Sequence, residues 1–316
     1  MPGAMKAPWQ WGDGMELQFH EVAKRYGAKE ALRGIDLTLT PGVYGLLGPN
    51  GAGKSTLMNI LTGNLRPTRG RVTLDGQDTV SMGEAFRRRL GYCPQQQALY
   101  PGFTGEQFLY YMASLQGMSR EDAKERMDWA LARLDLTEAA GRPIRGWSGG
   151  MKQRVMIAIA LACSPELLIA DEPTTALDVT IQAQVLELMK KLKQEYQTSL
   201  ILITHDLGVV AKICDKVAVV YAGEIVESGT LKEIYTDKRH PYTIGLFDSL
   251  PDIENDASTL KVIQGMVPDP ANLPDGCKFH PRCPYATEAC QTGKIKPVKL
   301  SDSHMVRCNR FSDTEV

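Results

Sequence analysis

Short apolar runs of strand length recur along this chain, separated by segments with helical periodicity. The runs cover residues 42–47, 167–170, 200–203 and 217–221. Between the second and third runs, apolar residues recur on one helix face at Ile181, Val185, Leu188 and Leu192. Strands that alternate with helices in this way predict a largely parallel sheet covered by helices on both faces.

Two stretches depart from this alternation. Residues 15–39 are interpreted as short strands, in which Leu17 and Phe19 alternate with polar positions, and they predict an antiparallel strand layer. Over about residues 96–165 helical periodicity replaces the strands, and Thr104 with Gln107 forms a T-x-x-Q capping box that predicts a helix start. We therefore expect a helical subdomain inserted in an α/β core.

The same pattern divides the chain into three parts. Residues 1–14 contain few aliphatic side chains and are interpreted as a loose leader, whereas residues 15–235 carry the α/β pattern. Residues 236–316 are richer in Pro, Asp and Cys, which indicates a separate C-terminal extension. The expected fold is an α/β core with a mostly parallel sheet, an N-terminal antiparallel strand layer, a helical subdomain and a small Cys-rich tail.

Composition and charge exclude several classes of protein. The 316 residues carry a formal net charge of −1, which gives no overall basic footprint for a nucleic acid. Hydrophobic residues make up 43% and charged residues 23%, as in folded globular chains. The longest apolar run, residues 155–163, is far shorter than a membrane-spanning helix, and the N-terminus lacks a signal peptide. These features predict an intracellular protein.

A glycine-rich sequence follows the first apolar run. Residues 48–55 read Gly-Pro-Asn-Gly-Ala-Gly-Lys-Ser, the G-x-x-x-x-G-K-S pattern of a P-loop, between a predicted strand and a predicted helix. In such a loop, backbone N–H groups converge on phosphate oxygens at the positive end of the helix. Lys54 would bring a charge to the β- and γ-phosphates, and the Ser55 hydroxyl is a ligand that suits Mg²⁺. The pattern predicts a nucleotide site.

The second apolar run ends in two carboxylates, Asp171 and Glu172. Alone, an acidic pair at a strand end is more often a solvated cap. In a chain that also holds a P-loop, the pair indicates a second nucleotide motif. We expect Asp171 to hold the Mg²⁺ shell and Glu172 to polarise the attacking water.

Further motifs connect the chain to a known family. Residues 147–151, Trp-Ser-Gly-Gly-Met, resemble the signature motif of ABC-transporter ATPases, and other motifs of that family occur in the expected order. The resemblance covers roughly residues 15–235. It implies an ATPase that works as a pair of subunits, with ATP held between the P-loop of one subunit and residues 148–150 of the other.

The resemblance also assigns roles to single residues. Tyr26 looks like the aromatic residue that stacks on adenine, Gln95 like the Q-loop glutamine, and His205 like the switch histidine at the γ-phosphate. Residues 176–178 resemble the D-loop. The implied catalytic set is Glu172, His205 and Gln95, and the implied Mg²⁺ ligands are Ser55, Gln95 and Asp171. The implied nucleotide contacts are Tyr26, Gly48, Asn50, Gly51, Gly53, Lys54, Ser55, Thr56, Ser148, Gly149, Gly150 and Asp178.

The two halves of the chain resemble different branches of this family. From about Trp147 onward the sequence is similar to the ATPases of dipeptide and oligopeptide permeases, including Arg239-His-Pro-Tyr-Thr at residues 239–243. Earlier in the chain, Pro-Asn-Gly at residues 49–51 and Tyr-Cys-Pro-Gln at residues 92–95 resemble the exporter-type ATPases of multidrug and antibiotic systems. The second half implies peptide import. An ABC exporter ATPase is the alternative, ahead of a soluble ABC ATPase outside transport.

Both kinds of transporter imply similar partners. Because no membrane span is expected in this chain, the resemblance implies separate transmembrane permease subunits and a second ATP-binding subunit, either identical or homologous. An importer would also use an extracytoplasmic substrate-binding protein. The chain would then work as a peripheral protein at the cytoplasmic face of the cell membrane.

Four of the seven cysteines gather near the C-terminus. Cys277, Cys283, Cys290 and Cys308 have the spacing C-x5-C-x6-C-x17-C, whereas zinc ribbons favour close C-x2-4-C pairs. Four soft thiolates suit either an iron–sulfur cluster or tetrahedral zinc, and unligated cysteines are the third interpretation. Similar tails in the peptide-permease branch are associated with a [4Fe–4S] cluster, so the resemblance implies that these four cysteines hold one.

Overall fold

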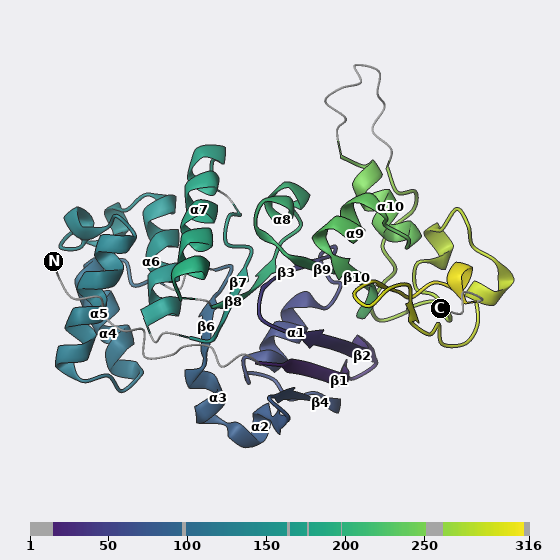
Figure 1. The fold of residues 1–316 in the computed structure, drawn as a ribbon, viewed down its shortest axis with the longest axis horizontal. Helices are drawn as coiled ribbons and strands as arrows, with labels where there is room; N and C mark the ends of the chain where they lie inside the picture. Colours follow the sequence, from purple (N-terminus) through teal and green to yellow (C-terminus); the bar gives the residue numbers. More distant parts are fainter. Residues whose placement is uncertain are drawn as a thin grey trace, which may run out of the picture. The chain divides into compact units, whose positions relative to one another are not determined.

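The computed structural model describes residues 15–96, 99–162, 165–175, 177–196, 198–250 and 262–312. Figure 1 shows the helices and strands in chain order. The chain divides into two compact units. The first unit comprises Met1–Glu16, Thr40–Val43 and Leu74–Ile203, and the second comprises Leu17–Leu39, Tyr44–Thr73 and Thr204–Val316.

The second unit begins with the antiparallel layer that the sequence predicted. β1 (Leu17–Tyr26) pairs with the antiparallel β2 (Lys29–Leu39), and β4 (Arg69–Leu74) lies on the other side of β1. Leu17 and Phe19 are buried, because alternate side chains of β1 point to the same face of the sheet.

A parallel pair of strands lies at the centre of the second unit. β3 (Val43–Leu47) runs parallel to β9 (Lys216–Tyr221), and β9 is antiparallel to β10 (Glu224–Thr230). Every residue of β3 is buried, as the continuous apolar run predicted. α1 (Lys54–Leu61) follows β3, so residues 48–53 form the loop at the carboxyl end of a buried strand.

The C-terminal part of the second unit extends this sheet. β12 (Met305–Val306) pairs with β10 and with β11 (Val298–Lys299), antiparallel in both cases. The remaining helices of the unit are α8 (Leu207–Ile213), α9 (Leu231–Thr236) and α10 (Pro241–Asp248), together with short 3-10 turns at His280–Arg282, Glu288–Cys290 and Asn309–Phe311.

The first unit contains three parallel strands. β7 (Leu167–Asp171) pairs with β6 (Leu90–Cys93) on one side and with β8 (Ser199–Ile203) on the other. α7 (Val179–Tyr196) connects β7 to β8. The short elements before β6 are β5 (Gln77–Asp78), α2 (Thr79–Met82) and α3 (Glu84–Arg88). The mostly parallel core predicted from the alternation is therefore present.

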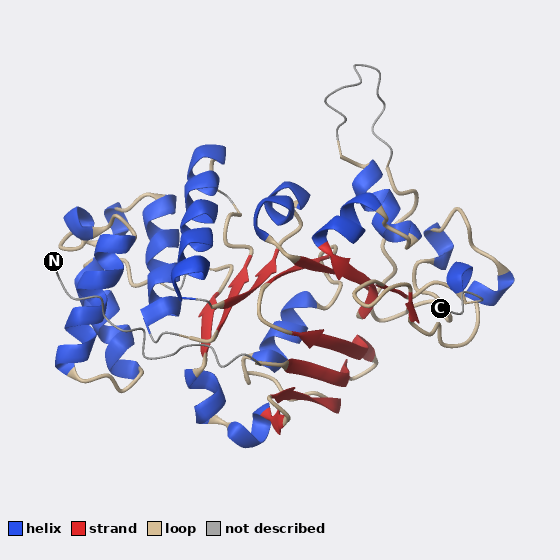
Figure 2. Ribbon diagram, viewed as in Figure 1, coloured by secondary structure: helices blue, strands red, loops and turns tan. Residues whose placement is uncertain are grey.

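The predicted helical subdomain follows β6. It consists of α4 (Gly105–Leu115), α5 (Arg120–Arg133) and α6 (Gly149–Ala162), which contact one another and form a group of helices in Figure 2. Thr104 and Gln107 form the expected capping box at the start of α4. Two 3-10 turns, Thr137–Ala139 and Ile144–Gly146, lead from α5 to α6.

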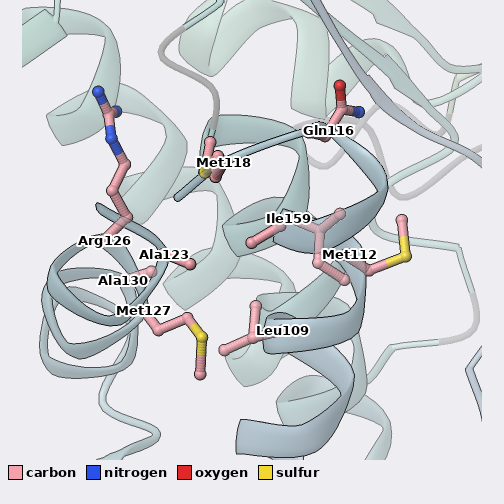
Figure 3. Close-up of a pocket in the computed structure, with 10 residues that line it drawn as sticks. Leu109, Met112, Gln116, Met118, Ala123, Arg126, Met127, Ala130 and Ile159 are labelled. Atoms are coloured by element: carbon pink, nitrogen blue, oxygen red, sulfur yellow. The ribbon is translucent and has the colours of Figure 1, made fainter. Parts of the chain in front are cut away.

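The subdomain is packed closely around apolar side chains. Figure 3 shows a cavity of about 20 Å³ that α4, α5 and α6 enclose between Leu109, Met127 and Ile159. A volume of this size holds about one water molecule, so it is a small packing defect and not a ligand site. In the described part of the chain, no helix combines the length and the apolar character that crossing a membrane requires.

Candidate functional site

The loop between β3 and α1 depends on glycine at two positions. Gly48 has φ +154°, and a methyl group there would lie 2.3 Å from the carbonyl oxygen of Val220. Gly53 has φ +103°, and a methyl group there would lie 2.6 Å from the carbonyl oxygen of Ala31. Any larger residue would collide with backbone at either position. The loop is thereby held against β9 and β2 in one conformation.

No side chain caps the start of α1. Gly53 caps the helix without a side-chain hydrogen bond, and the first turn contains no acidic residue. The first N–H groups of a helix have no partner within the helix and attract anions. Ser55 is exposed and Thr56 is half-buried in this turn, and Asn50 and Gly51 are exposed in the loop before it. The arrangement suits a phosphate group.

Lys54 lies under the loop. Its side chain is buried, with 8% of its surface exposed, and its Nζ donates to the carbonyl oxygens of Gly48 at 2.7 Å and Pro49 at 3.0 Å. These bonds hold the ammonium group beside the backbone that would surround a phosphate. A buried cation beside the start of a helix makes this end of β3 favourable for a polyphosphate.

Two further candidate residues belong to the second unit. Tyr26 ends β1 with 47% of its surface exposed, and Lys24 Nζ lies 5.3 Å from the centre of its ring. His205 is exposed and directly follows Thr204, whose N–H donates to Leu46 in β3. The second unit thus places His205 at the end of β3 from which the glycine-rich loop starts.

The first unit gathers the other candidates at the carboxyl edge of its strands. Asp171 ends β7 and is buried, and Gln95 is exposed two residues after β6. Glu172 has φ +49°, an uncommon conformation for a residue other than glycine. Its N–H donates to Ile203 at 2.9 Å, and Thr175 Oγ1 donates to its Oε2 at 2.8 Å. Backbone and side chain together fix the direction of the Glu172 carboxyl group.

A polar cluster beside Asp171 was not expected from the sequence. The Tyr92 hydroxyl is hydrogen-bonded to Asp171, and burial together with that nearby charge raises the pKa of Tyr92 to about 12. Cys93 is buried, which raises the pKa of its thiol to about 12, and Gln153 Nε2 donates to its sulfur at 3.4 Å. The pairing of β6 with β7 brings Tyr92 and Cys93 close to Asp171, and α6 contributes Gln153. Sequence patterns alone do not reveal these contacts between distant segments.

The signature-like residues lie at the start of α6. Ser148 is exposed, and its Oγ accepts from the N–H of Met151 at 3.3 Å. A methyl group on Gly150 would lie 2.5 Å from Ile181 Cγ2, so α6 begins in direct contact with α7. Asp178 Oδ1 accepts from the N–H of Ile181 at 2.9 Å and caps α7. Ala176, the first residue of the D-loop motif, lies outside the described residues.

The four tail cysteines lie near one another in the second unit. Among the described residues, no group of three or more His, Cys, Asp or Glu side chains is arranged to hold a metal ion. Burial raises the pKa of Cys277 to about 11, and the sulfurs of Cys308, Cys290 and Cys283 lie near enough to raise it further. The four residues are free cysteines.

The Arg-His-Pro-Tyr-Thr motif joins the core to the tail. Glu227 in β10 is completely buried and accepts from the N–H groups of Arg239 at 2.6 Å and His240 at 3.0 Å. His304, from the turn before β12, places Nε2 2.9 Å from the same carboxyl group. Burial lowers the pKa of His240 to about 4, and its Nδ1 accepts from the N–H of Tyr242 to cap α10. Glu227 thus connects three segments.

Two known families match parts of the sequence. Residues 32–175 match the family described as ABC transporter, and residues 226–290 match the family described as Oligopeptide/dipeptide transporter, C-terminal region. The oligopeptide transport ATP-binding protein AppD of Bacillus subtilis is 40% identical over 301 residues, which cover 90% of this chain and 92% of the relative. OppD of Salmonella typhimurium, also an oligopeptide transport ATP-binding protein, is 41% identical over 84% of this chain and 83% of its own length.

Solved structures give the same result for the fold. The chain is similar to cbiO1 from Clostridium perfringens, part of the ABC transporter complex cbiONQ, with a TM-score of 0.65 and 29% identity over 73% of this chain and 94% of that one. It is also similar to the ATP-binding cassette MJ0796 in a post-hydrolysis state bound to ADP and Pi. The TM-score there is 0.61, with 29% identity over 68% of this chain and 98% of that one.

Proposed function

Because the chain belongs to the family of ABC transporter ATP-binding proteins, we propose that it is the ATPase subunit of a peptide importer and works at the cytoplasmic face of the membrane. The observation that carries the proposal is the 40% identity to an oligopeptide transport ATP-binding protein over 90% of the chain. The match spans both the half that resembles exporters and the half that resembles peptide permeases. It therefore favours import over the exporter alternative.

The geometry of the loop supports a specific mode of ATP binding. Lys54 and the N–H groups at the start of α1 would hold the β- and γ-phosphates, and the exposed ring of Tyr26 would stack on adenine. Ser55, Gln95 and Asp171 offer a hydroxyl, an amide oxygen and a carboxylate, the hard donors that Mg²⁺ prefers. The donor chemistry thus fits Mg²⁺, which would neutralise phosphate charge when bound.

Glu172 is suited to act on the attacking water. Its carboxyl group is half-buried and accepts a hydrogen bond from Thr175 at 2.8 Å, so its direction is set before a nucleotide arrives. A carboxylate in a fixed direction can orient a water molecule and take its proton. We propose that His205 contacts the γ-phosphate. Ser148, Gly149, Gly150 and Asp178 of a second subunit would complete the site.

An aromatic surface on the helical subdomain is our proposed contact with the permease. We define it by Tyr100, Phe103 and Tyr111, which are 48%, 37% and 37% exposed. Their rings lie 5.2–6.1 Å apart, centre to centre. Clustered exposed aromatic side chains are typical of surfaces that bind another protein. The surface follows Gln95 closely in the sequence, which would connect partner binding to the nucleotide site.

Reconstitution tests the proposed function. The chain, its permease subunits and the substrate-binding protein would be purified from the host and assembled in vesicles. We expect ATP hydrolysis to drive labelled peptide across the membrane from the side of the binding protein. ATP-dependent movement of peptide or drug in the opposite direction would contradict import and favour an exporter. The Lys54→Ala variant serves as the control without productive ATP binding.

We also propose that the four tail cysteines hold a [4Fe–4S] cluster once iron and sulfide are supplied, with zinc as the alternative occupant. Their mutual proximity supports this proposal, because a cluster held by four cysteines needs all four sulfurs close together. Protein purified without oxygen is expected to be brown and to contain about four irons per chain. Colourless protein with one zinc would favour the alternative, and metal-free protein would contradict both. Cys214→Ser, at a cysteine outside the tail, is the matched control.

A further inference from the structure

Two segments that are distant in the sequence pair through their backbones in the first unit. The segment 100–106 carries part of the aromatic surface, and the segment 139–147 ends directly before Ser148. Three hydrogen bonds join them, from the N–H of Ile144 to Phe103 at 2.9 Å, of Arg145 to Pro101 at 3.0 Å and of Glu106 to Ala140 at 3.1 Å. An antiparallel bridge between Thr104 and Pro143 adds to the pairing.

The side chain of Trp147 completes this connection. It is 4% exposed, and a methyl group on Gly105 would lie 2.5 Å from its Cη2 and 2.6 Å from its Cζ2. The indole ring is rigid and cannot withdraw as a flexible chain end could. The first residue of α4 must therefore be glycine as long as Trp147 occupies this place.

Hydrogen bonding does not explain why a tryptophan stands here. The indole N–H is buried and has no acceptor among the described residues. A buried donor without an acceptor destabilises a fold. The indole N–H therefore does not stabilise this position. The contribution of Trp147 is the packing of a large, rigid ring against Gly105.

The opposite side of the α6 start is equally constrained. Gly150 packs so closely on α7 that its methyl group would lie 2.5 Å from Ile181 Cγ2. The start of α6 is therefore held on one side by the contact of Trp147 with Gly105 of α4, and on the other side by the contact of Gly150 with Ile181 of α7. Ser148 lies between these two contacts, at the surface.

We propose that Trp147 is a positioning residue that makes Ser148–Gly150 and the aromatic surface move as one body, through its contact with Gly105. The inference rests on the proposed assembly with permease subunits. A permease that displaces the aromatic surface would displace the start of α6 by the same amount, because close packing and backbone hydrogen bonds leave no flexible joint between them.

The test compares ATP hydrolysis by the isolated chain with hydrolysis by the assembled transporter. The ratio of the two rates measures stimulation by the permease. We expect Gly105→Ala and Trp147→Phe each to lower this ratio by a factor on the order of ten or more, since small displacements of reacting groups carry large rate penalties. The affinity of the isolated chain for a labelled ATP analogue should not change, because neither residue belongs to the P-loop.

Gly141→Ala is the matched control, because a methyl group there meets no atom within 4 Å. The permease should stimulate ATP hydrolysis by this variant as strongly as it stimulates the wild type. A merely structural role for Trp147 would lower both rates in proportion and leave the ratio unchanged, and that result would overturn the inference. A normal ratio in both test variants would do the same. A wild-type chain that the permease does not stimulate would overturn the proposed function itself, and the inference with it.

Discussion

Glu172→Gln is expected to lower the rate of ATP hydrolysis by a factor on the order of 10²–10⁴, the usual loss when a positioned general base is removed. The amide has the size of the carboxyl group and can still accept from Thr175, so the local fold should persist. ATP affinity should be retained, because the phosphates are expected to bind through Lys54. The ATP-bound pair of subunits should then accumulate and be detectable by size-exclusion chromatography with Mg-ATP.

A matched control separates this chemistry from a general effect of charge. Glu187 lies exposed on α7 of the same unit, and Glu187→Gln should hydrolyse ATP at the wild-type rate. Lys54→Ala should behave differently from Glu172→Gln and lose nucleotide binding itself. Hydrolysis at the wild-type rate by Glu172→Gln would show that another group activates the water.

Glu227→Ala is expected to destabilise the second unit by about 3–5 kcal/mol, because it leaves two backbone N–H groups and His304 without their buried acceptor. The free energy of unfolding can be measured by urea denaturation. Limited proteolysis should also cut between residues 262 and 312 faster than in the wild type, since β12 loses its anchor on β10.

Glu288→Ala offers the comparison within the same tail. Glu288 is exposed in the 3-10 turn Glu288–Cys290, and its replacement should change the unfolding free energy little. Equal stability of the Glu227→Ala and Glu288→Ala proteins would mean that the buried carboxyl group does not hold the tail on the core.

Local patterns in the sequence predicted the parts of the site that depend on neighbouring residues. The loop at residues 48–55 combines glycine, lysine and serine with a strand before it and a helix after it, so its conformation and chemistry are stated within one short segment. The capping box at Thr104 is equally local. The strand–loop–helix arrangement and the capping box are both present as predicted, because each is encoded within a few neighbouring residues.

Contacts between segments that are distant in the sequence could not be predicted from such local patterns. Tyr92 reaches Asp171 only because β6 pairs with β7, and Trp147 meets Gly105 only because two loops pair their backbones. The tail cysteines show the same limit from the other side. Their spacing suggested a ligand set, but spacing does not encode the loop conformations that place the sulfurs, so the cluster stays a prediction.

The short hairpin of β11 and β12 also bears on the solubility of shortened versions of this chain. β12 covers β10 through the pairs Glu227 with Val306 and Ser228 with Met305. A chain cut before the hairpin would present β10 as an open edge strand, with unpaired backbone groups beside the apolar side chains of Ile225 and Val226. Open edges of this kind template intermolecular strand pairing and aggregation. The hairpin is therefore also a guard against self-association, independent of any metal that the tail holds.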